Sequence, residues 1–330
     1  MVDPADDRAL RAWFGAFDAS HRHRWPGEPG WSFTEIQAQA VDRPGLIRTV
    51  LLAAVEDGSV VGVSCVELPE ADNRHLVEVT VEVPPDHRRR GIGTALLVAH
   101  ENLALEEGRT VLVGRQGQAV GVDPTPGRAL AERHGYQVVL EDVRRDLAVP
   151  VPEEQLAALE GTAYQHATDY EVVTFADRWP DAYVEDRALF GQRMSTDVPL
   201  GEVDRTEERW DADRVRRTEA LIRSMGRFLL VAAAVERASG RVVAFSEIAV
   251  PRDEPEKAYQ WDTLVLREHR GHRLGLLMKV ANLRQLATAS PATSSVTTWN
   301  ARQNDPMIAV NEALGCTVAG HQVEWQKRFA

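Results

Sequence analysis

Two parts of the chain repeat the same order of hydrophobic and polar positions. Residues 76–83 alternate hydrophobic and polar side chains, which predicts a strand with one face in a core. Residues 94–107 have the apolar spacing of a helix, and a turn rich in arginine and glycine joins the two. The same order returns with a predicted strand over residues 259–266 and a helix over residues 276–287. The pattern therefore predicts two copies of a strand–turn–helix unit.

The hydrophobic pattern predicts further elements around each copy. In the first half we expect helices over residues 3–17, 34–40 and 128–134, strands over 48–55, 60–68, 109–114 and 137–147, and a loop over 114–127. In the second half we expect helices over 153–161, 181–195, 204–225 and 307–314, and strands over 170–175, 228–236, 241–250, 295–300 and 321–329. Residues 21–31 are expected to form a loop that either lines an acceptor site or only connects two helices. The fold class is α/β (α+β), with each half a mixed, mostly antiparallel sheet flanked by helices.

The two arginine- and glycine-rich turns are candidate anion sites. The first signature, residues 88–94, has Arg-Arg-Arg-Gly-Ile-Gly-Thr, and the second signature, residues 270–276, has Arg-Gly-His-Arg-Leu-Gly-Leu. Each turn precedes a helix start, where free backbone N–H groups and partial positive charge favour anions. Glycine lets the backbone approach a ligand closely. We therefore expect each turn to bind a pyrophosphate.

The spacing of the signatures indicates a tandem duplication. The second signature begins at position 270 and the first at position 88, and this offset (270 − 88 = 182) is the length of a whole domain. Two prolines within residues 149–152 mark a boundary, so we expect domains over residues 1–148 and 166–330 with a linker over 149–165. The two sheets are expected to share an interface. Exchange of strands between them is one possible arrangement, with residues 166–180 as a candidate to complete the first sheet.

The first signature resembles the acyl-CoA motif of the GNAT superfamily of N-acetyltransferases, with Arg88-x-x-Gly91-x-Gly93. The second has Arg270-x-x-Arg273-x-Gly275, in which Arg273 replaces the first glycine. A later segment of the second half, Asn304-x-x-Met307-x-x-x-Asn311-x-x-x-Gly315-Cys316, is similar to a second GNAT motif. In the first half the corresponding residues are Pro124, Ala131, Gly135 and Tyr136. The whole chain resembles the tandem, two-domain GNAT proteins of actinobacteria, the architecture of mycothiol synthase.

This resemblance implies acetyl-CoA as cofactor and a set of residues that bind it. The signatures are expected to hold the pyrophosphate, and the backbone at the end of the preceding strand is expected to polarise the thioester carbonyl. In the first half these residues are Val81, Glu82, Val83, Arg88, Arg89, Arg90, Gly91, Ile92, Gly93 and Thr94. In the second half they are Leu264, Val265, Leu266, Arg270, Gly271, His272, Arg273, Leu274, Gly275 and Leu276, with Asn300 and Asn304 as further candidates.

Transfer to an amine also needs a base, and carboxylates in the strands are the candidates. Strand alternation places Glu78, Thr80 and Glu82 on one face. A constant offset maps these three onto Gln260, Asp262 and Leu264. Glu78 is the candidate base of the first half, and Asp262 is either the base of the second half or a solvated acid. Glu247 points either into the cleft or to solvent.

Asn311 stands where the family often has a tyrosine that protonates the leaving thiolate. Asparagine can donate a hydrogen bond to sulfur but cannot supply a proton. We favour the second half as catalytic because it keeps Asn304 and the motif around it, and the first half as cofactor-binding or structural. If the φ of Arg273 is negative, the N–H groups of its turn remain available.

The predicted function is acetyl-CoA-dependent transfer of an acetyl group to a primary amine of a small metabolite, such as an antibiotic or thiol-sugar precursor. The alternatives are a protein or peptide N-acetyltransferase and an acyl-CoA-binding scaffold without catalysis. The formal net charge of −12 argues against a nucleic-acid partner and weakly favours a cationic acceptor. No stretch has the length of a membrane span or a signal, no cluster has metal-ligand spacing, and the two cysteines form no disulfide framework, so we expect a cytoplasmic protein of undetermined oligomeric state.

Overall fold

The computed structural model describes residues 1–28, 30–41, 45–199 and 201–329. The chain forms two compact units. The first unit consists of residues 1–142, 200–206 and 320–330, and the second of residues 143–199 and 207–319. Each unit is therefore built from two or three separate stretches of the sequence. The predicted domain boundaries at residues 148 and 166 stay a prediction.

Among the described residues the first unit has four helices, four complete strands and parts of two more strands. Its helices are α1 (Asp7–Arg24), α2 (Phe33–Ala40), α3 (Ile92–Glu106) and α4 (Thr125–Arg133). Its strands are β1 (Ile47–Glu56), β2 (Ser59–Pro69), β3 (Leu76–Glu82), β4 (Val111–Ala119), the first half of β5 (Gln137–Ala148) and most of β11 (Thr317–Arg328).

The second unit repeats this plan. Its helices are α5 (Glu153–Tyr164), α6 (Val184–Asp197), α7 (Ala212–Ser224), α8 (Leu274–Ala289) and α9 (Asp305–Leu314). Its strands are β6 (Tyr170–Ala176), β7 (Arg227–Glu236), β8 (Val242–Pro251), β9 (Lys257–Val265) and β10 (Ser295–Ala301), together with the second half of β5. A short 3-10 helix precedes each signature, at Pro85–His87 and at Arg267–His269, and these two helices are separated by the same offset as the signatures.

Pairing within each unit is mostly antiparallel, as predicted. The strand order is β1-β2-β3-β4-β11 in the first unit and β10-β9-β8-β7-β6 in the second. The parallel pairs are β3 with β4 and β9 with β10. Each parallel pair joins the strand before a signature to the strand after the helix that follows it, so the signature helix is the crossover connection.

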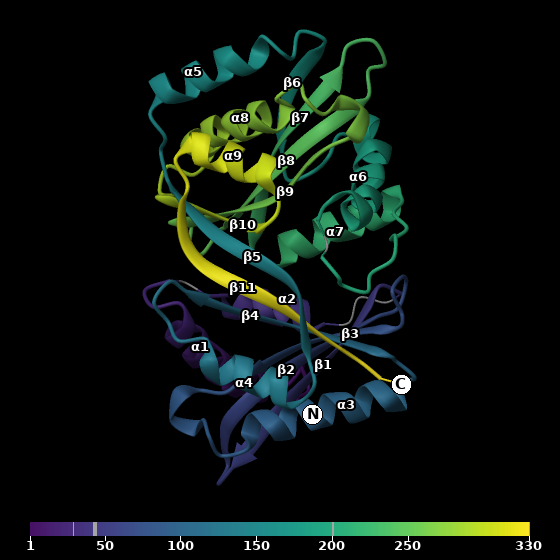
Figure 1. Cartoon of the computed structure of the whole chain (residues 1–330), viewed down its shortest axis with the longest axis vertical. Coiled ribbons are helices and arrows are strands. Elements are labelled where there is room, and N and C mark those ends of the chain that lie inside the picture. Colours follow the sequence, from purple (N-terminus) through teal and green to yellow (C-terminus); the bar gives the residue numbers. More distant parts are fainter. Residues whose placement is uncertain (29, 42–44, 200, 330) are drawn as a thin grey trace. The chain divides into compact units, whose positions relative to one another are not determined.

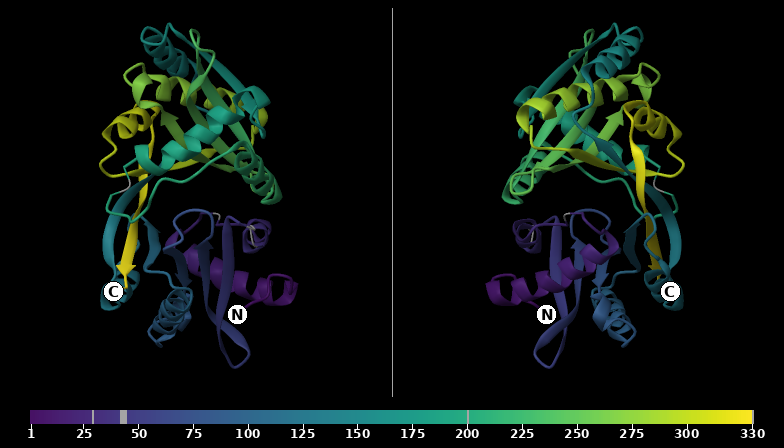
Figure 2. Two further views of the ribbon diagram at one scale, coloured as in Figure 1. Left: turned by 90° about the vertical axis from the view of Figure 1, so that its right-hand side faces the viewer. Right: turned by 90° about the vertical axis from the view of Figure 1, so that its left-hand side faces the viewer.

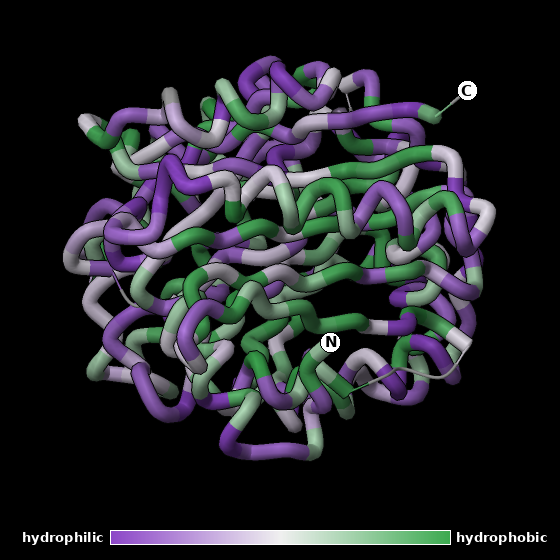
Figure 3. The backbone as a smooth tube through the Cα atoms, turned by 90° about the horizontal axis from the view of Figure 1, so that it is seen from below, coloured by the Kyte–Doolittle hydropathy of each residue, from purple (hydrophilic) through white to green (hydrophobic). Residues whose placement is uncertain are grey.

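Helices cover both faces of each sheet (Figures 1 and 2). In the first unit α1 and α2 pack on one face through Leu10, Trp13 and Ile36, and α3 packs on the other through Leu97 and Ala104. In the second unit α5, α8 and α9 cover one face and α6 and α7 the other. Hydrophobic stretches follow the strands, and hydrophilic stretches gather mainly in the connections (Figure 3). Each unit thus has two hydrophobic cores, one on each side of its sheet.

Three predicted elements differ from the structure. The first helix continues to Arg24, beyond the predicted end at residue 17, and β4 continues to Ala119 through part of the predicted loop. Residues 204–211 are not helical, so α7 begins at Ala212. β4 is long because Ala119 pairs with Gly320 of β11, a partner far along the chain that a local pattern does not reveal.

Strand exchange occurs, but not through residues 166–180. The C-terminal strand β11 completes the sheet of the first unit, where Arg328 pairs with Val111 of β4. Residues 170–176 form β6 and pair with β7 inside the second unit, so the prediction that they complete the first sheet is wrong. Residues 201–206 also belong to the first unit, and Thr206 donates its backbone N–H to Asn73 Oδ1 at 2.7 Å.

No helix within the described ranges is long and apolar enough to cross a membrane. Over the same residues no group of histidine, cysteine, aspartate and glutamate side chains could hold a metal ion.

Candidate functional site

The parallel strands β3 and β4 of the first unit separate along their length. Their pairing ends at Val79 and Gly114, yet β3 continues to Glu82 and β4 to Ala119. Beyond Val79 the backbone edge of β3 that faces β4 has no partner strand. Backbone groups in such an edge remain available to hydrogen-bond a ligand that enters between the strands.

A pocket of about 410 Å³ lies at this opening. Its walls come from α1, the end of β3, the first signature, β4, β11 and the segment around α4. Charged and polar side chains make up much of the lining: Ser20, His23, Arg24, Glu82, His87, Arg88, Arg89, Thr94, Arg115, Gln116, Gln118, Asp123, Arg133 and Tyr136. Most of the predicted cofactor residues of the first unit therefore lie together in one pocket, and Arg90, which is not among the lining residues, pairs with Glu56.

The helix start at the first signature faces this pocket with free N–H groups. Gly91 precedes α3 with φ of 85°, and no side chain caps the helix. The carbonyl of Gly91 accepts the N–H of Ala95 at 2.9 Å, which leaves the first N–H groups of α3 without an intrahelical acceptor. Arg89 also has a positive φ of 63°. Backbone turns of this kind point successive N–H groups at one anion.

Arg88 and Arg89 bring positive charge to the same turn. The Nε of Arg88 donates to the carbonyl of Val83 at 2.9 Å, which holds the guanidinium at the end of β3. Partial burial lowers the pKa of Arg88, while the nearby Glu82 carboxylate opposes this shift. An arginine remains protonated at neutral pH in either case. The turn therefore presents both backbone donors and a fixed cation.

Arg24 crosses the opening between the strands. Its NH1 donates to the carbonyl of Gly117 on β4 at 2.9 Å, and its NH2 pairs with the Glu82 carboxylate on β3. Ser20, one helical turn earlier on α1, donates its hydroxyl to the other oxygen of Glu82 at 2.7 Å. The Glu82 side chain is 8% exposed. Glu82 is thus a buried carboxylate with two hydrogen-bonding partners inside the pocket wall.

The pocket wall contains buried polar atoms that no protein group satisfies. Among the described residues Arg24 Nε, Gln118 Oε1, Tyr136 OH and Trp325 Nε1 have no hydrogen-bond partner. A buried donor or acceptor without a partner costs about 1–3 kcal/mol. Acetyl-CoA carries a diphosphate, two amides and a thioester, so the open helix start and these unpaired groups fit its chemistry. The residues present are therefore compatible with this cofactor.

Glu78, the predicted base of the first unit, lies outside the pocket lining. Its carboxylate accepts a hydrogen bond from Arg205 NH2 at 2.7 Å, and Arg115 lies 4.0 Å away. Arg205 belongs to the segment of residues 201–206 that returns to the first unit. The geometry gives Glu78 a structural contact, and the buried carboxylate that lines the pocket is Glu82 instead.

The second unit opens its parallel strands in the same way, but another segment of the chain contacts its signature. Pairing of β9 with β10 ends at Tyr259 and Thr297, although both strands continue. The imidazole of His272 donates to the carbonyl of His166 at 2.9 Å. The hydroxyl of Tyr170, a residue that is 6% exposed, bonds His269 at 3.0 Å. The segment between α5 and β6 therefore lies against the second signature.

The first turn of α8 is also closed from inside. Leu274 is 1% exposed and Leu276 is 7% exposed, and the N–H of Leu276 bonds the carbonyl of Arg273 at 3.1 Å. Arg273 has φ of 56°, the left-handed conformation that Gly91 adopts in the first unit. From the sequence we expect the N–H groups of this turn to stay available if the φ of Arg273 is negative, and this φ is positive. A non-glycine residue in this conformation costs about 1–2 kcal/mol.

Polar side chains fill the interior that corresponds to the first pocket. Lys279 Nζ donates to Asn311 Oδ1 at 2.7 Å, and Asn311 Nδ2 donates to Asn300 Oδ1. Asn311 is 0% exposed and uses both ends of its amide. At the positions that correspond to Lys279 and Asn311 the first unit has Leu97 and Ala131, which both line the pocket. Asn304 caps α9 by accepting the N–H of Met307 at 3.4 Å.

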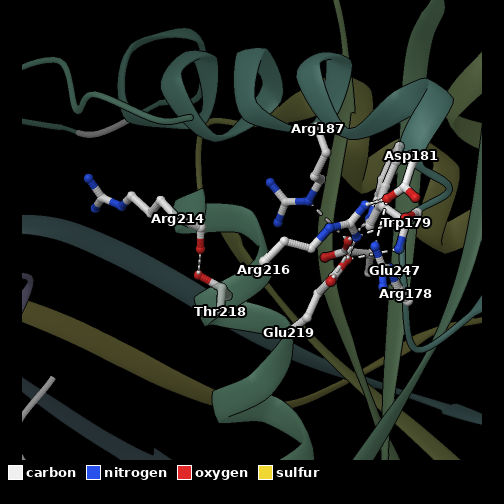
Figure 4. Close-up of polar contacts among 9 residues, drawn as sticks. All are labelled: Arg178, Trp179, Asp181, Arg187, Arg214, Arg216, Thr218, Glu219 and Glu247. Atoms are coloured by element: carbon white, nitrogen blue, oxygen red, sulfur yellow. Dashed lines mark hydrogen bonds and ion pairs between the residues drawn. The ribbon is translucent and has the colours of Figure 1, made fainter. Parts of the chain in front are cut away.

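Glu247, a predicted acid of the second unit, lies in a different polar cluster (Figure 4). Glu247 is 2% exposed, and its carboxylate accepts Trp179 Nε1 at 3.1 Å and Arg187 Nε at 3.2 Å. The expectation that Glu247 points to solvent is therefore wrong. Arg216 and Glu219 of α7 extend this network toward the backbone of Trp179. The cluster joins α6 and α7 to the sheet.

Asp262 lies at the edge of this cluster, 3.9 Å from Arg187, with 42% of its side chain exposed. Partial burial and the Glu247 charge raise the pKa of Asp262 to about 6, and Arg187 opposes the shift. A raised pKa near a partner charge is also common in structural ion-pair networks, so it does not by itself identify a base.

A bulge changes the correspondence between the two halves. The register between β8 and β9 shifts, whereas β2 and β3 pair without a shift. Glu82 corresponds to Leu264, with the same offset as the two signatures. Before the bulge the offset is smaller by one, so that Glu78 corresponds to Tyr259 and not to Gln260 as a constant offset predicted.

Ser20, His23 and Arg24 also line the pocket. Ser20 was not predicted, whereas His23 and Arg24 lie within residues 21–31, for which lining an acceptor site was one of the two alternatives. The predicted helix ended too early, and these residues fell into or beside a predicted loop. A helical signal existed, because Ser20 and Arg24 continue the spacing of the buried Trp13 and Phe17. Extending that face by two turns would have placed Arg24 on the sheet side of α1.

Comparison with known proteins supports the same family for this chain. Residues 10–136 match the model described as "Acetyltransferase (GNAT) family". Over 114 residues the chain is 39% identical to mycothiol acetyltransferase of Geodermatophilus obscurus, which covers 34% of this chain and 34% of that protein. The match thus spans about a third of the length of that relative.

Solved structures resemble the chain over its whole length. A tandem GNAT protein from the clavulanic acid biosynthesis pathway is 26% identical, with a TM-score of 0.79 over 99% of this chain and 97% of that one. A GCN5-related N-acetyltransferase from Sphaerobacter thermophilus has the same fold, with 18% identity and a TM-score of 0.64 over 99% and 93%. Residues 10–136 therefore match the GNAT acetyltransferase family, and the whole chain, with its two signatures and a sheet opening after each, is similar to a tandem GNAT protein.

Proposed function

We propose that the protein transfers an acetyl group from acetyl-CoA to a primary amine of a small metabolite, and that the first unit holds the cofactor. One contrast carries the proposal. The start of α3 lines a pocket, whereas Leu274 and Leu276 in the first turn of α8 are only 1% and 7% exposed. This geometry favours the first half, in place of the second half that the sequence favoured.

Each group in the pocket has a part in the proposed reaction. When bound, acetyl-CoA supplies the thioester that the acceptor amine attacks. The N–H groups of residues 92–94, with Arg88 and Arg89, would hold the diphosphate. The free backbone edge at residues 81–83 would donate to the thioester carbonyl. The Glu82 carboxylate would accept the proton of the amine, because it is the buried acid in the pocket wall, and CoA would leave as its thiolate.

The relatives support the acyl donor and the class of reaction. The protein from Geodermatophilus obscurus is named an acetyltransferase, and the tandem protein from the clavulanic acid pathway is described with reference to AcCoA. The first of these relatives matches the chain over only about a third of its own length. The acceptor is therefore argued from the pocket itself.

Two matched substitutions test which signature binds. Gly91 and Gly271 have φ of 85° and 87°, and no atom lies within 4 Å of an added Cβ at either position. Gly91→Asp and Gly271→Asp therefore add the same charge to the two signature turns, each at a residue with positive φ and room for the new side chain. Titration of each variant with acetyl-CoA by calorimetry is expected to show at least about a hundredfold weaker binding for Gly91→Asp, because the carboxylate repels the diphosphate.

The outcomes separate the possible functions. Equal loss in both variants would mean that both signatures bind, and loss only in Gly271→Asp would move the site to the second unit. Binding to the wild type without release of free CoA across a broad amine panel would favour an acyl-CoA-binding scaffold. Turnover with peptides but not with small amines would favour a protein or peptide N-acetyltransferase.

A further inference from the structure

The pocket contains an ion pair that an acceptor must either bypass or replace. Arg24 and Glu82 pair with side-chain exposures of 23% and 8%. Arg24 reaches Glu82 from α1 across the gap between β3 and β4, and it is tethered on the β4 side by the carbonyl of Gly117. Both partners line the pocket together with Ser20. The pair therefore stands between the two strands whose opening forms the site.

Removal of one partner from a buried ion pair is strongly unfavourable, because the remaining charge stays in a poorly solvated place without a counter-charge. An acceptor that carries only an ammonium group would compete with Arg24 for the Glu82 carboxylate and leave Arg24 unpaired. An acceptor that carries a carboxylate beside its ammonium group supplies a partner to both. A zwitterion thus replaces the internal pair without leaving either charge uncompensated.

We propose that the acceptor is an amino acid or a closely related amino-carboxylate, with its ammonium group at Glu82 and its carboxylate at Arg24. This inference rests on the proposed function and names the substrate class of that same pocket. Arg24 is then the specificity-determining residue, and its role is to hold the carboxylate of the acceptor.

Two unpaired atoms near this ion pair have the complementary chemistry. Arg24 Nε is buried and donates to no described group, so the guanidinium retains a donor for a carboxylate. Gln118, the residue after Gly117 on β4, has a buried Oε1 without a partner, which suits an ammonium N–H. The charges of the pocket lining also suit an acceptor with both charges. The lining contains the acids Glu82 and Asp123, and arginines are its most frequent charged residues. Acceptors with several positive charges are disfavoured by this lining.

The test uses matched sets of acceptors with the full-length wild-type protein. Each of the twenty amino acids is compared with its carboxamide and its decarboxylated amine, and free CoA thiol is measured with acetyl-CoA as donor. At least one amino acid is expected to have a kcat/KM about tenfold or more above those of its amide and amine, since only the amino acid pairs with both charges.

Variants of Arg24 test whether this residue binds the carboxylate of the acceptor. Arg24→Gln is expected to raise KM for the amino acid and reduce its advantage over the amide to less than about threefold, with a smaller change in kcat. Arg24→Lys is expected to restore part of the preference because it restores the charge. Arg22→Gln is the matched control, since Arg22 lies on the same helix end but is 74% exposed and paired with Asp18. Acetyl-CoA binding and the thermal midpoint check that each variant is folded.

Each result supports or overturns the proposed amino-acid acceptor. Wild-type use of amides and simple amines at the same efficiency as amino acids overturns the inference, as does an unchanged preference in Arg24→Gln. If acetyl-CoA binds but no amino acid is acetylated, the inference is wrong while the proposed cofactor site stands. If acetyl-CoA does not bind at all, the proposed function fails first, and the substrate class fails with it.

Discussion

The imidazole of His100 on α3 and the hydroxyl of Ser64 on β2 share a hydrogen bond in the core of the first unit, where both residues are 0% exposed. The same two positions recur in the second unit, at the offset that separates the signatures. There Asn282 of α8 donates its side-chain amide to the backbone carbonyl of Ser246 on β8 at 2.7 Å, again with both residues fully buried. Each unit thus uses one polar side chain to fix its signature helix on the sheet, with different chemistry in the two copies.

The first prediction concerns the acid stability of this contact. Burial lowers the pKa of His100 to about 4, from an ordinary value of 6.5. Between pH 6.5 and 4 the unfolded chain takes up the proton and the folded chain does not, so stability falls as the pH falls. His100→Asn copies the second unit and removes this proton uptake. Urea denaturation is expected to show a slope up to about 1.4 kcal/mol per pH unit steeper in the wild type.

Equal slopes for the wild type and His100→Asn in this window would contradict the buried, neutral imidazole. The measurement is made at several pH values between 4 and 7, and m-values are compared to confirm that both proteins unfold in the same manner.

The second prediction separates the two carboxylates of β3. Glu82→Gln is expected to lower kcat by about 10²–10⁴-fold, the usual contribution of a general base, while acetyl-CoA still binds. Glu78→Gln is expected to leave kcat within about twofold and to lower the thermal midpoint, because it weakens the contact to Arg205. Steady-state kinetics and thermal denaturation of both variants provide the comparison. A large loss of kcat in Glu78→Gln alone would restore Glu78 as the base.

The third prediction concerns Asp262 in the second unit. The pKa of this carboxyl is raised to about 6 in the folded protein, above the ordinary value of 3.8. Between pH 4 and 6 the folded chain keeps a proton that the unfolded chain has lost, so stability falls as the pH rises through this range. Asp262→Asn is expected to abolish this fall and to leave kcat unchanged. The stability effect is small because 42% of the side chain is exposed.

Loss of turnover in Asp262→Asn, without loss of acetyl-CoA affinity, would instead assign the base to the second unit. The variant therefore tests the choice between the two units independently of the signature substitutions.

The fourth prediction concerns the filled interior of the second unit. Burial lowers the pKa of Lys279 to about 8 from 10.5, so wild-type stability falls as the pH falls from 10.5 to 8, where only the unfolded chain takes up a proton. Lys279→Leu alone leaves Asn311 Oδ1 without its donor, at a cost of about 1–3 kcal/mol. Combined with Asn311→Ala it copies Leu97 and Ala131 of the first unit.

The double variant is expected to be more stable than Lys279→Leu and to lose the pH dependence between 8 and 10.5. Denaturation of the three proteins at pH 7, 8, 9 and 10 measures both effects. A double variant that is less stable than the single variant would show that the polar chain is required for packing.

Most of the local fold was accessible from the sequence. Alternating patterns placed the hairpins of β1 with β2 and of β7 with β8, and the two signature helices, within a few residues of their observed bounds. The errors have two origins. The end of α1 was placed too early although its apolar spacing continues, whereas the length of β4 and the irregular residues before α7 depend on partners far along the chain, such as β11 for β4. Propensity over a short window contains no information about such partners.

The candidate site divides in the same manner. The first signature was predicted from the sequence and lines the pocket, whereas the pairing of Arg24 with Glu82 was not predicted because it joins residues 58 positions apart. The predicted residues Asn300 and Asn311 do come together, but in a buried chain with Lys279. The sequence thus placed Asn300 and Asn311 in one candidate site. It did not show that these side chains occupy the interior that is a pocket in the first unit.

The sequence alone determined that the chain has two copies of one strand–turn–helix unit. The hydrophobic period, the glycines and the charges that define this unit are local properties that can be read from a short stretch of sequence. Only the tertiary structure decided that one helix start is open and the other covered. Tyr170 lies far before the second signature in the chain, and its burial against His269 follows from packing that no local pattern encodes.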